Sequence, residues 1–213
     1  MSFILVGVVI FLTIPKPGKS NFLYVGLLLI VCLLTELISF IGAHALHTNM
    51  NWSINIFVLL NFPLILLIYK DRIHWQGIKK IAYAMIIAFA LFELINMFLI
   101  QGIYAVNTYS VSITGVCVIV ISLLYFYVLI QQLPTESITK LPMFWINTAM
   151  LIYWSGTFLF FLSADYLITV MKNNMITFLF IHHLVALIYY PMLAYSLWLV
   201  RLEAVASPAT ISK

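Results

Sequence analysis

The 213-residue chain contains little charge: Asp, Glu, Lys and Arg make up 8% of it, against roughly 25% in an ordinary soluble domain. Hydrophobic residues make up 65%, and the mean hydropathy over the whole chain is +1.15. An internal core cannot bury that much apolar surface, so lipid must surround most of the chain. This composition excludes a soluble protein and predicts an all-α, polytopic bundle embedded in the lipid bilayer.

Cysteines and long hydrophilic segments are also scarce. Cys32 and Cys117, the only two cysteines, both lie within apolar runs, so we expect no disulfide. The net charge of +4 is small and gives no reason to expect a nucleic-acid partner. No hydrophilic segment is long enough to form a soluble domain. We therefore expect the function to lie within the membrane or to require a separate partner.

Polar and turn residues divide the chain into seven apolar runs. A helix needs about 20 apolar residues to cross the hydrocarbon core, and six of the runs meet this length. The first has 12 residues, about 18 Å of helix, and no basic segment precedes it, so we interpret it as a short retained helix rather than a signal peptide. The sequence predicts one domain, residues 1–201, with spans at 3–14, 22–44, 52–69, 81–100, 109–130, 143–164 and 175–200, and a short tail, 202–213.

Lys and Arg gather in alternate connections between these runs. The opposite connections contain only Lys172. Short loops rich in Lys and Arg stay in the cytoplasm, so we expect a multi-pass protein of the cell membrane, its N-terminus outside and its C-terminal tail in the cytoplasm. Six helices keep this orientation even if the first run does not span. The nine bases on the cytoplasmic side are Lys16, Lys19, Lys70, Arg72, Lys79, Lys80, Lys140, Arg201 and Lys213.

Two carboxylates fall within predicted spans. An ionised Glu36 or Glu93 is costly there, so each is a candidate ligand- or ion-binding group. Ser39 and Asn96 follow these acids by three residues and therefore lie on nearly the same helix faces. Asn61, near a mid-span proline, adds a fifth polar candidate. The alternative is that these groups only make hydrogen bonds that hold helices together.

The histidines form a second candidate site. His44 and His47 are three residues apart, so both imidazoles can face one point, as a metal site requires. His182 and His183 are adjacent, so at most one of them should face the bundle, and Asp165 lies at the end of the preceding span. Together these residues can hold zinc with an activated water, or a haem between two helices. The alternative is a solvated pair of histidines at the membrane interface.

The last predicted span separates this chain from two seven-helix families. Its histidines stand in the sequence Phe-Ile-His-His-Leu-Val-Ala, residues 180–186, and residues 175–200 contain no Lys. The topology resembles that of the zinc hydrolases related to alkaline ceramidases, but their H-x-x-x-H pair is missing. It also resembles that of the microbial rhodopsins, but the Lys for a retinal Schiff base is missing.

Three functions from different classes remain open. The first is a sensor or receptor-like binding module with a polar intramembrane pocket that signals through a separate cytoplasmic partner. The second is a small proton- or cation-coupled transporter that uses Glu36 and Glu93. The third is an intramembrane enzyme that uses zinc or haem at the histidines. A homo-oligomer is compatible with all three.

Overall fold

The structure is a computed structural model that describes residues 2–15, 22–73, 75–105, 107–132, 137–162 and 175–206, with the backbone alone at residues 2, 43, 162 and 175–182. Within these residues the fold is all-helical and contains no strand. A π-helical turn, η1 (Asn96–Ile100), continues α5, and a 3₁₀ turn, η2 (Ile138–Lys140), precedes α7. The seven α-helices are α1 (Ser2–Thr13), α3 (Leu23–His44), α4 (Asn51–Tyr69), α5 (Ile78–Ile95), α6 (Thr108–Gln132), α7 (Pro142–Leu162) and α9 (Met175–Ala206).

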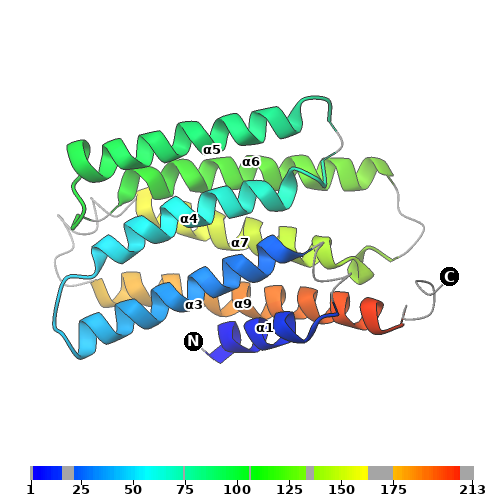
Figure 1. Cartoon of the computed structure of the whole chain (residues 1–213), viewed down its shortest axis with the longest axis horizontal. Helices are drawn as coiled ribbons and strands as arrows, with labels where there is room; N and C mark the ends of the chain where they lie inside the picture. Colours follow the sequence, from blue (N-terminus) through cyan, green and yellow to red (C-terminus); the bar gives the residue numbers. More distant parts are fainter. Residues whose placement is uncertain are drawn as a thin grey trace.

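Successive helices run in opposite directions (Figure 1). Helix α9 packs between α1 and α7, and α7 packs on α6. Helix α3 joins α1 to α4, and α4 also contacts α5 and α6. We call the end with residues 70–80, between α4 and α5, the basic end. The other end, where α3 ends and α4 begins, is the cavity end.

Six helices are long and apolar enough to cross a membrane, which confirms the prediction of a membrane-embedded helical bundle. Helix α1 is shorter, as expected from its run of 12 residues. Helix α9 continues to Ala206, whereas the predicted span ends at residue 200 and the predicted tail begins at 202. Alanines favour this extension. The guanidinium of Arg201 also lies 5.4 Å from the centre of the Trp198 ring, which supports the additional turn.

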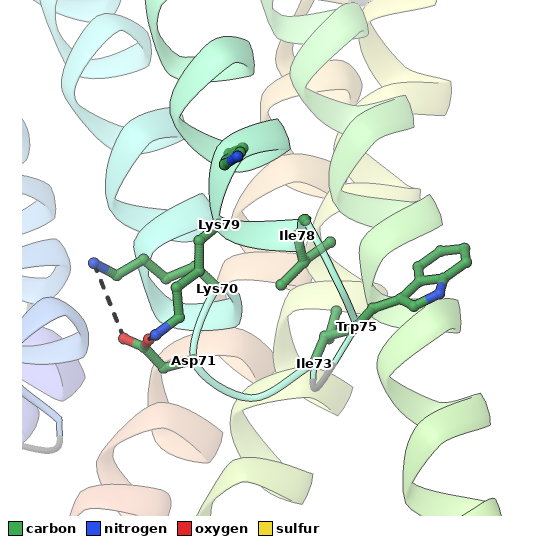
Figure 2. A pocket seen from close by; sticks show the side chains of 8 residues that line it. Lys70, Asp71, Ile73, Trp75, Ile78 and Lys79 are labelled. Atoms are coloured by element: carbon green, nitrogen blue, oxygen red, sulfur yellow. Dashed lines mark ion pairs between the residues drawn. The ribbon is translucent and has the colours of Figure 1, made fainter.

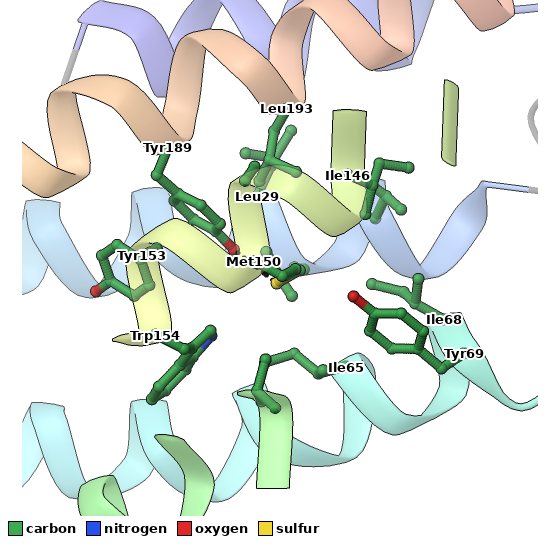
Figure 3. Packing of buried hydrophobic residues seen from close by; sticks show 14 of the residues in the cluster. Leu29, Ile65, Ile68, Tyr69, Ile146, Met150, Tyr153, Trp154, Tyr189 and Leu193 are labelled. Carbon is green, nitrogen blue, oxygen red and sulfur yellow. Dashed lines mark hydrogen bonds between the residues drawn. The ribbon is translucent and has the colours of Figure 1, made fainter. Parts of the chain in front are cut away.

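The centre of the bundle is an apolar core (Figure 3). Leu29, Ile146 and Leu193 are fully buried there, on α3, α7 and α9. Beside them the Tyr69 hydroxyl donates to Asn147 Oδ1 at 2.7 Å and lies 3.1 Å from Ser122 Oγ. These bonds join α4, α6 and α7, the kind of contact that orders helices where the hydrophobic effect between them is weak.

Helix α1 packs closely against the bundle because glycines at its contacts leave room for larger side chains. Phe11 is buried, and its ring lies against Gly26 of α3 so closely that a Cβ atom on Gly26 would be 2.3 Å from the ring. A Cβ atom on Gly7 of α1 would likewise be 2.9 Å from Leu29. The glycines therefore bring the backbones of α1 and α3 together, as small residues do in membrane helix contacts.

We expect Gly26→Val to destabilise the protein by about 1–3 kcal/mol, because its side chain must displace the Phe11 ring from a packed interface. Thermal unfolding of the detergent-purified protein measures the effect. The matched control is Leu27→Val, at a neighbouring position with 37% exposure, which should change the midpoint little. Equal midpoints for Gly26→Val and the unmodified chain would contradict the close contact.

Candidate functional site

A cavity of about 840 Å³ lies toward the cavity end, among α1, α3, α4, α6, α7 and α9. Small-molecule sites in proteins range over roughly 300–1,000 Å³. The space is therefore large enough for a ligand of many atoms. It lies in the half of the bundle away from the basic end, next to the apolar core.

Helix α3 supplies one continuous face of this cavity. Cys32, Thr35, Glu36, Ser39 and Phe40 all line it, with the spacing of a single helical stripe. Glu36 is therefore aligned with Ser39, as the sequence predicts. The Thr35 hydroxyl donates to the carbonyl of its own helix at residue 31, at 2.9 Å, so it is already satisfied. Glu36 is the acidic group that this helix brings to the cavity.

Helices α7 and α9 bring further polar groups to the same space. Tyr153 and Tyr190 line it. The Tyr153 ring stacks on Tyr189 with centroids 4.4 Å apart, which fixes its orientation (Figure 3). His183 also lines the cavity, from α9. Hydroxyl, imidazole and carboxylate groups from three helices thus converge on one volume.

Two of the lining groups have unused hydrogen-bonding capacity. Trp154 is 2% exposed and Thr157 is 3% exposed, and both line the cavity. Among the described residues, neither the Trp154 Nε1–H donor nor the Thr157 hydroxyl oxygen has a hydrogen-bond partner. Buried polar groups in proteins are nearly always paired, so each such exception needs an explanation. A ligand with one polar group would supply the missing partner.

The rest of the lining is apolar, and part of it faces the surroundings of the protein. Phe3, Phe40 and Leu187 line the cavity yet are 47%, 53% and 58% exposed. Helix α1 lies beside α3 and α9 but, as described, is much shorter than either (Figure 1). The cavity therefore borders the lipid-facing surface near Phe3. The apolar lining residues are Phe3, Phe40, Ile54, Phe57, Val58, Val111, Phe161, Leu184, Ala186 and Leu187.

Glu93 belongs to a different cluster. It is fully buried on α5, and its Oε1 accepts a hydrogen bond from Asn107 Nδ2 at 2.6 Å. Asn96, aligned with it as expected, is also buried and lies 3.1 Å from Ser110 Oγ on α6. Glu93 is not among the residues that line the cavity around Glu36. The structure thus places the two acids in separate sites.

Asn61 is buried in α4 and does not line the cavity. Its Oδ1 has no hydrogen-bond partner in the described part of the chain. Its position does not connect it to either carboxylate. Asn61 is therefore a buried residue of α4 that belongs to neither candidate site.

The histidines are not brought together as a set. His44 is exposed and stacks on Phe40, with centroids 4.4 Å apart and Nδ1 3.1 Å from that residue's carbonyl oxygen. His47 is exposed, with φ at 50°. Asp165 and the side chain of His182 lie outside the described residues. Within those residues no group of three or more His, Cys, Asp or Glu side chains could hold a metal ion. His183, in the cavity, is the histidine that meets other candidate groups.

At the basic end, a cleft of about 400 Å³ lies between the end of α4 and the start of α5 (Figure 2). Lys79 Nζ lies 2.9 Å from an Asp71 carboxylate oxygen, and Lys70 Nζ lies 4.0 Å from the other. The Lys70 ammonium also donates to the Tyr83 hydroxyl at 2.8 Å, which raises the pKa of Lys70. Lys79 lowers the pKa of Asp71, so this pairing is complete at neutral pH and is lost as the pH falls through the pKa of the folded state.

Sequence reasoning missed several residues of both sites. Neither Tyr153 nor Trp154 is among the candidate residues that the sequence offers, yet both line the cavity. Sequence reasoning also gave no role to Gln101 and Asn107, which flank the connection between α5 and α6 and reach back to Asn96. Amide side chains at the edges of apolar runs are a signal that could have drawn attention to them. Gly156 permits a close contact between α7 and α9, because a Cβ atom there would lie 3.0 Å from Val185 of α9.

Comparison of the chain with protein families, curated proteins and solved structures finds no match. No function can therefore be transferred from a relative. A function must be inferred from the geometry and chemistry of the sites themselves.

Removal of the Thr157 hydroxyl, which has no partner among the described residues, should not destabilise the protein. We expect Thr157→Val to leave the midpoint of thermal unfolding unchanged or raised, because a buried group without a partner is replaced by one of the same shape. Ser122→Ala should instead destabilise the protein by about 1 kcal/mol, because the Tyr69 hydroxyl loses a neighbour. A loss of stability in Thr157→Val as large as in Ser122→Ala would show that Thr157 is already satisfied.

Proposed function

We propose that this protein is a membrane-embedded, receptor-like binding module whose ligand occupies the cavity around Glu36. The observation that carries the proposal is the composition of the cavity lining. An acid and several hydrogen-bonding groups meet there within an otherwise apolar space. Binding sites for small molecules have this composition, with a few convergent polar groups that fix orientation and specificity.

The residues that line the cavity also indicate which chemical class of ligand would fit it. An apolar body fits against the Phe, Leu and Val side chains of the cavity. One polar or basic group on that body can reach Glu36, and an acceptor on it can receive the Trp154 Nε1–H. The exposed lining residues support entry from the surrounding lipid. We therefore propose a lipid-soluble ligand with a single polar region.

Signalling by such a module requires a partner, because the described residues form only the helical bundle. We propose that the basic end faces the cytoplasm, following the distribution of Lys and Arg. Lys79 and Lys80 are exposed there, beside the exposed Asp71. Helices α3 and α9 line the cavity and extend toward this end (Figure 1). A shift in their packing when the ligand binds would therefore move the basic end, where a partner could detect it.

Binding of 1-aminoanthracene, a fluorescent apolar amine, tests the proposal in lipid nanodiscs. We expect saturable energy transfer from tryptophan to the probe, because Trp154 lines the cavity. Glu36→Gln should weaken binding about tenfold or more, since a hydrogen-bonded charge is lost. Ala186→Trp should abolish it by filling the cavity.

The matched controls separate the cavity from general uptake into lipid. Ile87→Trp adds the same bulk at a position with 62% exposure, and Glu93→Gln removes the other buried acid. Both should bind the probe as the unmodified chain does. Energy transfer that does not saturate, or that is unchanged in Glu36→Gln and Ala186→Trp, would contradict a binding site in this cavity.

The proposed orientation has its own test. In a chain with Cys32 and Cys117 replaced by Ala, we expect Lys80→Cys in intact cells to react with a membrane-impermeant maleimide only after permeabilisation. Tyr104→Cys, in the connection at the cavity end with 63% exposure, should react without it. The reverse pattern would place the basic end outside the cell.

A further inference from the structure

The cluster around Glu93 contains two buried oxygens with no hydrogen-bond partner among the described residues. One is Glu93 Oε2, on a residue with 0% exposure, and the other is Asn96 Oδ1, on a residue with 1% exposure. The two residues are three apart in sequence, so they share one helix face. A buried carboxylate oxygen without a partner is costly, and a second orphaned oxygen beside it adds to the cost.

Further oxygens surround this pair. The Asn96 amide nitrogen lies 3.0 Å from Gln101 Oε1, 3.1 Å from Asn107 Oδ1 and 3.1 Å from Ser110 Oγ. Two of these oxygens also have a second donor, because the backbone N–H of Ser110 donates to Asn107 Oδ1 at 3.2 Å and that of Tyr109 donates to Gln101 Oε1 at 3.4 Å. Several oxygens therefore gather around Asn96, while Glu93 Oε2 and Asn96 Oδ1 keep no partner among the described residues. Rotation of the Asn96 amide would place another oxygen among them.

The protonation state of Glu93 decides how this cluster can be satisfied. When ionised, the Glu93 carboxylate leaves Oε2 as an acceptor without a donor. A proton on Oε2 supplies one donor, which Asn96 Oδ1 can accept, so the protonated acid is the alternative to a bound cation. A small cation next to Oε2 and Asn96 Oδ1 pairs both oxygens and neutralises the carboxylate. From this we infer that the Glu93 cluster binds a monovalent cation, with Na⁺ as the fitting example.

The donor set favours this class of ion over others. It offers one carboxylate together with amide and hydroxyl oxygens, which suit hard cations. The cluster residues Glu93, Asn96, Gln101, Asn107 and Ser110 include no Cys or His, the softer ligands that zinc prefers. One negative charge in a buried site is balanced by one positive charge, whereas a divalent ion would leave an excess charge in a region of low dielectric.

The local backbone is also specialised at this point. Helix α5 changes to the π-helical turn η1 at Asn96, and the chain then turns at Gly102, where φ is +89°. π-turns of this kind occur frequently at functional sites. Gln101 is partly exposed and joins Asn96 to Thr108 through hydrogen bonds at 3.0 and 2.7 Å. It closes the cluster at its edge, where an ion from the water phase would enter.

Thermal unfolding of the full chain in detergent tests the inference at constant ionic strength, with NaCl replaced stepwise by N-methyl-D-glucamine chloride. A ligand that binds only the folded state raises the midpoint as its concentration rises. We expect a saturating increase of about 5 °C with Na⁺. Glu93→Gln, which keeps the side-chain shape, should remove the increase. Ser110→Ala, a milder change, should shift the Na⁺ dependence to concentrations about threefold higher or more.

Glu36→Gln is the matched control, because it removes the acid of the other site and should keep the full Na⁺ response. This control also separates the cation site from the proposed ligand cavity: probe binding can fail while the Na⁺ response remains, and the reverse also holds. An equal midpoint in all salts overturns the inference. A Na⁺ response that persists in both Glu93→Gln and Ser110→Ala also overturns it, since the ion would then bind elsewhere.

Discussion

Hydrocarbon supplies no hydrogen bonds, and this constraint shapes the whole bundle. Each backbone N–H and C=O group must be satisfied within its own helix, which leaves side chains to join helices to one another. Tyr69, Ser122 and Asn147 show the result in the core, where three helices share one small network. The same constraint makes a polar group without a partner costly. The few exceptions therefore deserve functional explanations.

Within the described residues, four of the six exceptions fall into two places of different character, and the other two are Asn61 Oδ1 and Thr114 Oγ1. Trp154 Nε1 and Thr157 Oγ1 border a large, mainly apolar space and are suited to a molecule with an apolar body. Glu93 Oε2 and Asn96 Oδ1 lie in a compact polar cluster and are suited to a small ion. Each of these two places contains one carboxylate, Glu36 in the first and Glu93 in the second. The two acids therefore lie in separate sites, which weakens the argument for a transporter that uses Glu36 and Glu93 together.

The helices could be predicted from the sequence because their period and length are imposed by the bilayer. The observed α4, Asn51–Tyr69, differs from the predicted 52–69 by one residue. The alignment of Ser39 with Glu36 followed from helix geometry alone. Which helices face each other is not encoded in such patterns. The Asn107–Glu93 bond therefore could not be foreseen, because it depends on the turn between α5 and α6 and on tertiary packing.

The exposed apolar residues of the cavity lining have a consequence for the ligand proposed above. Because Phe3 and Leu187 line the cavity and are 47% and 58% exposed, the bilayer itself would be the reservoir from which a lipid-soluble molecule arrives. Such a molecule is enriched by its partition coefficient before it meets the protein. Occupancy then follows the mole fraction of ligand in the membrane rather than its aqueous concentration. A site of modest intrinsic affinity can thereby report on the composition of the bilayer.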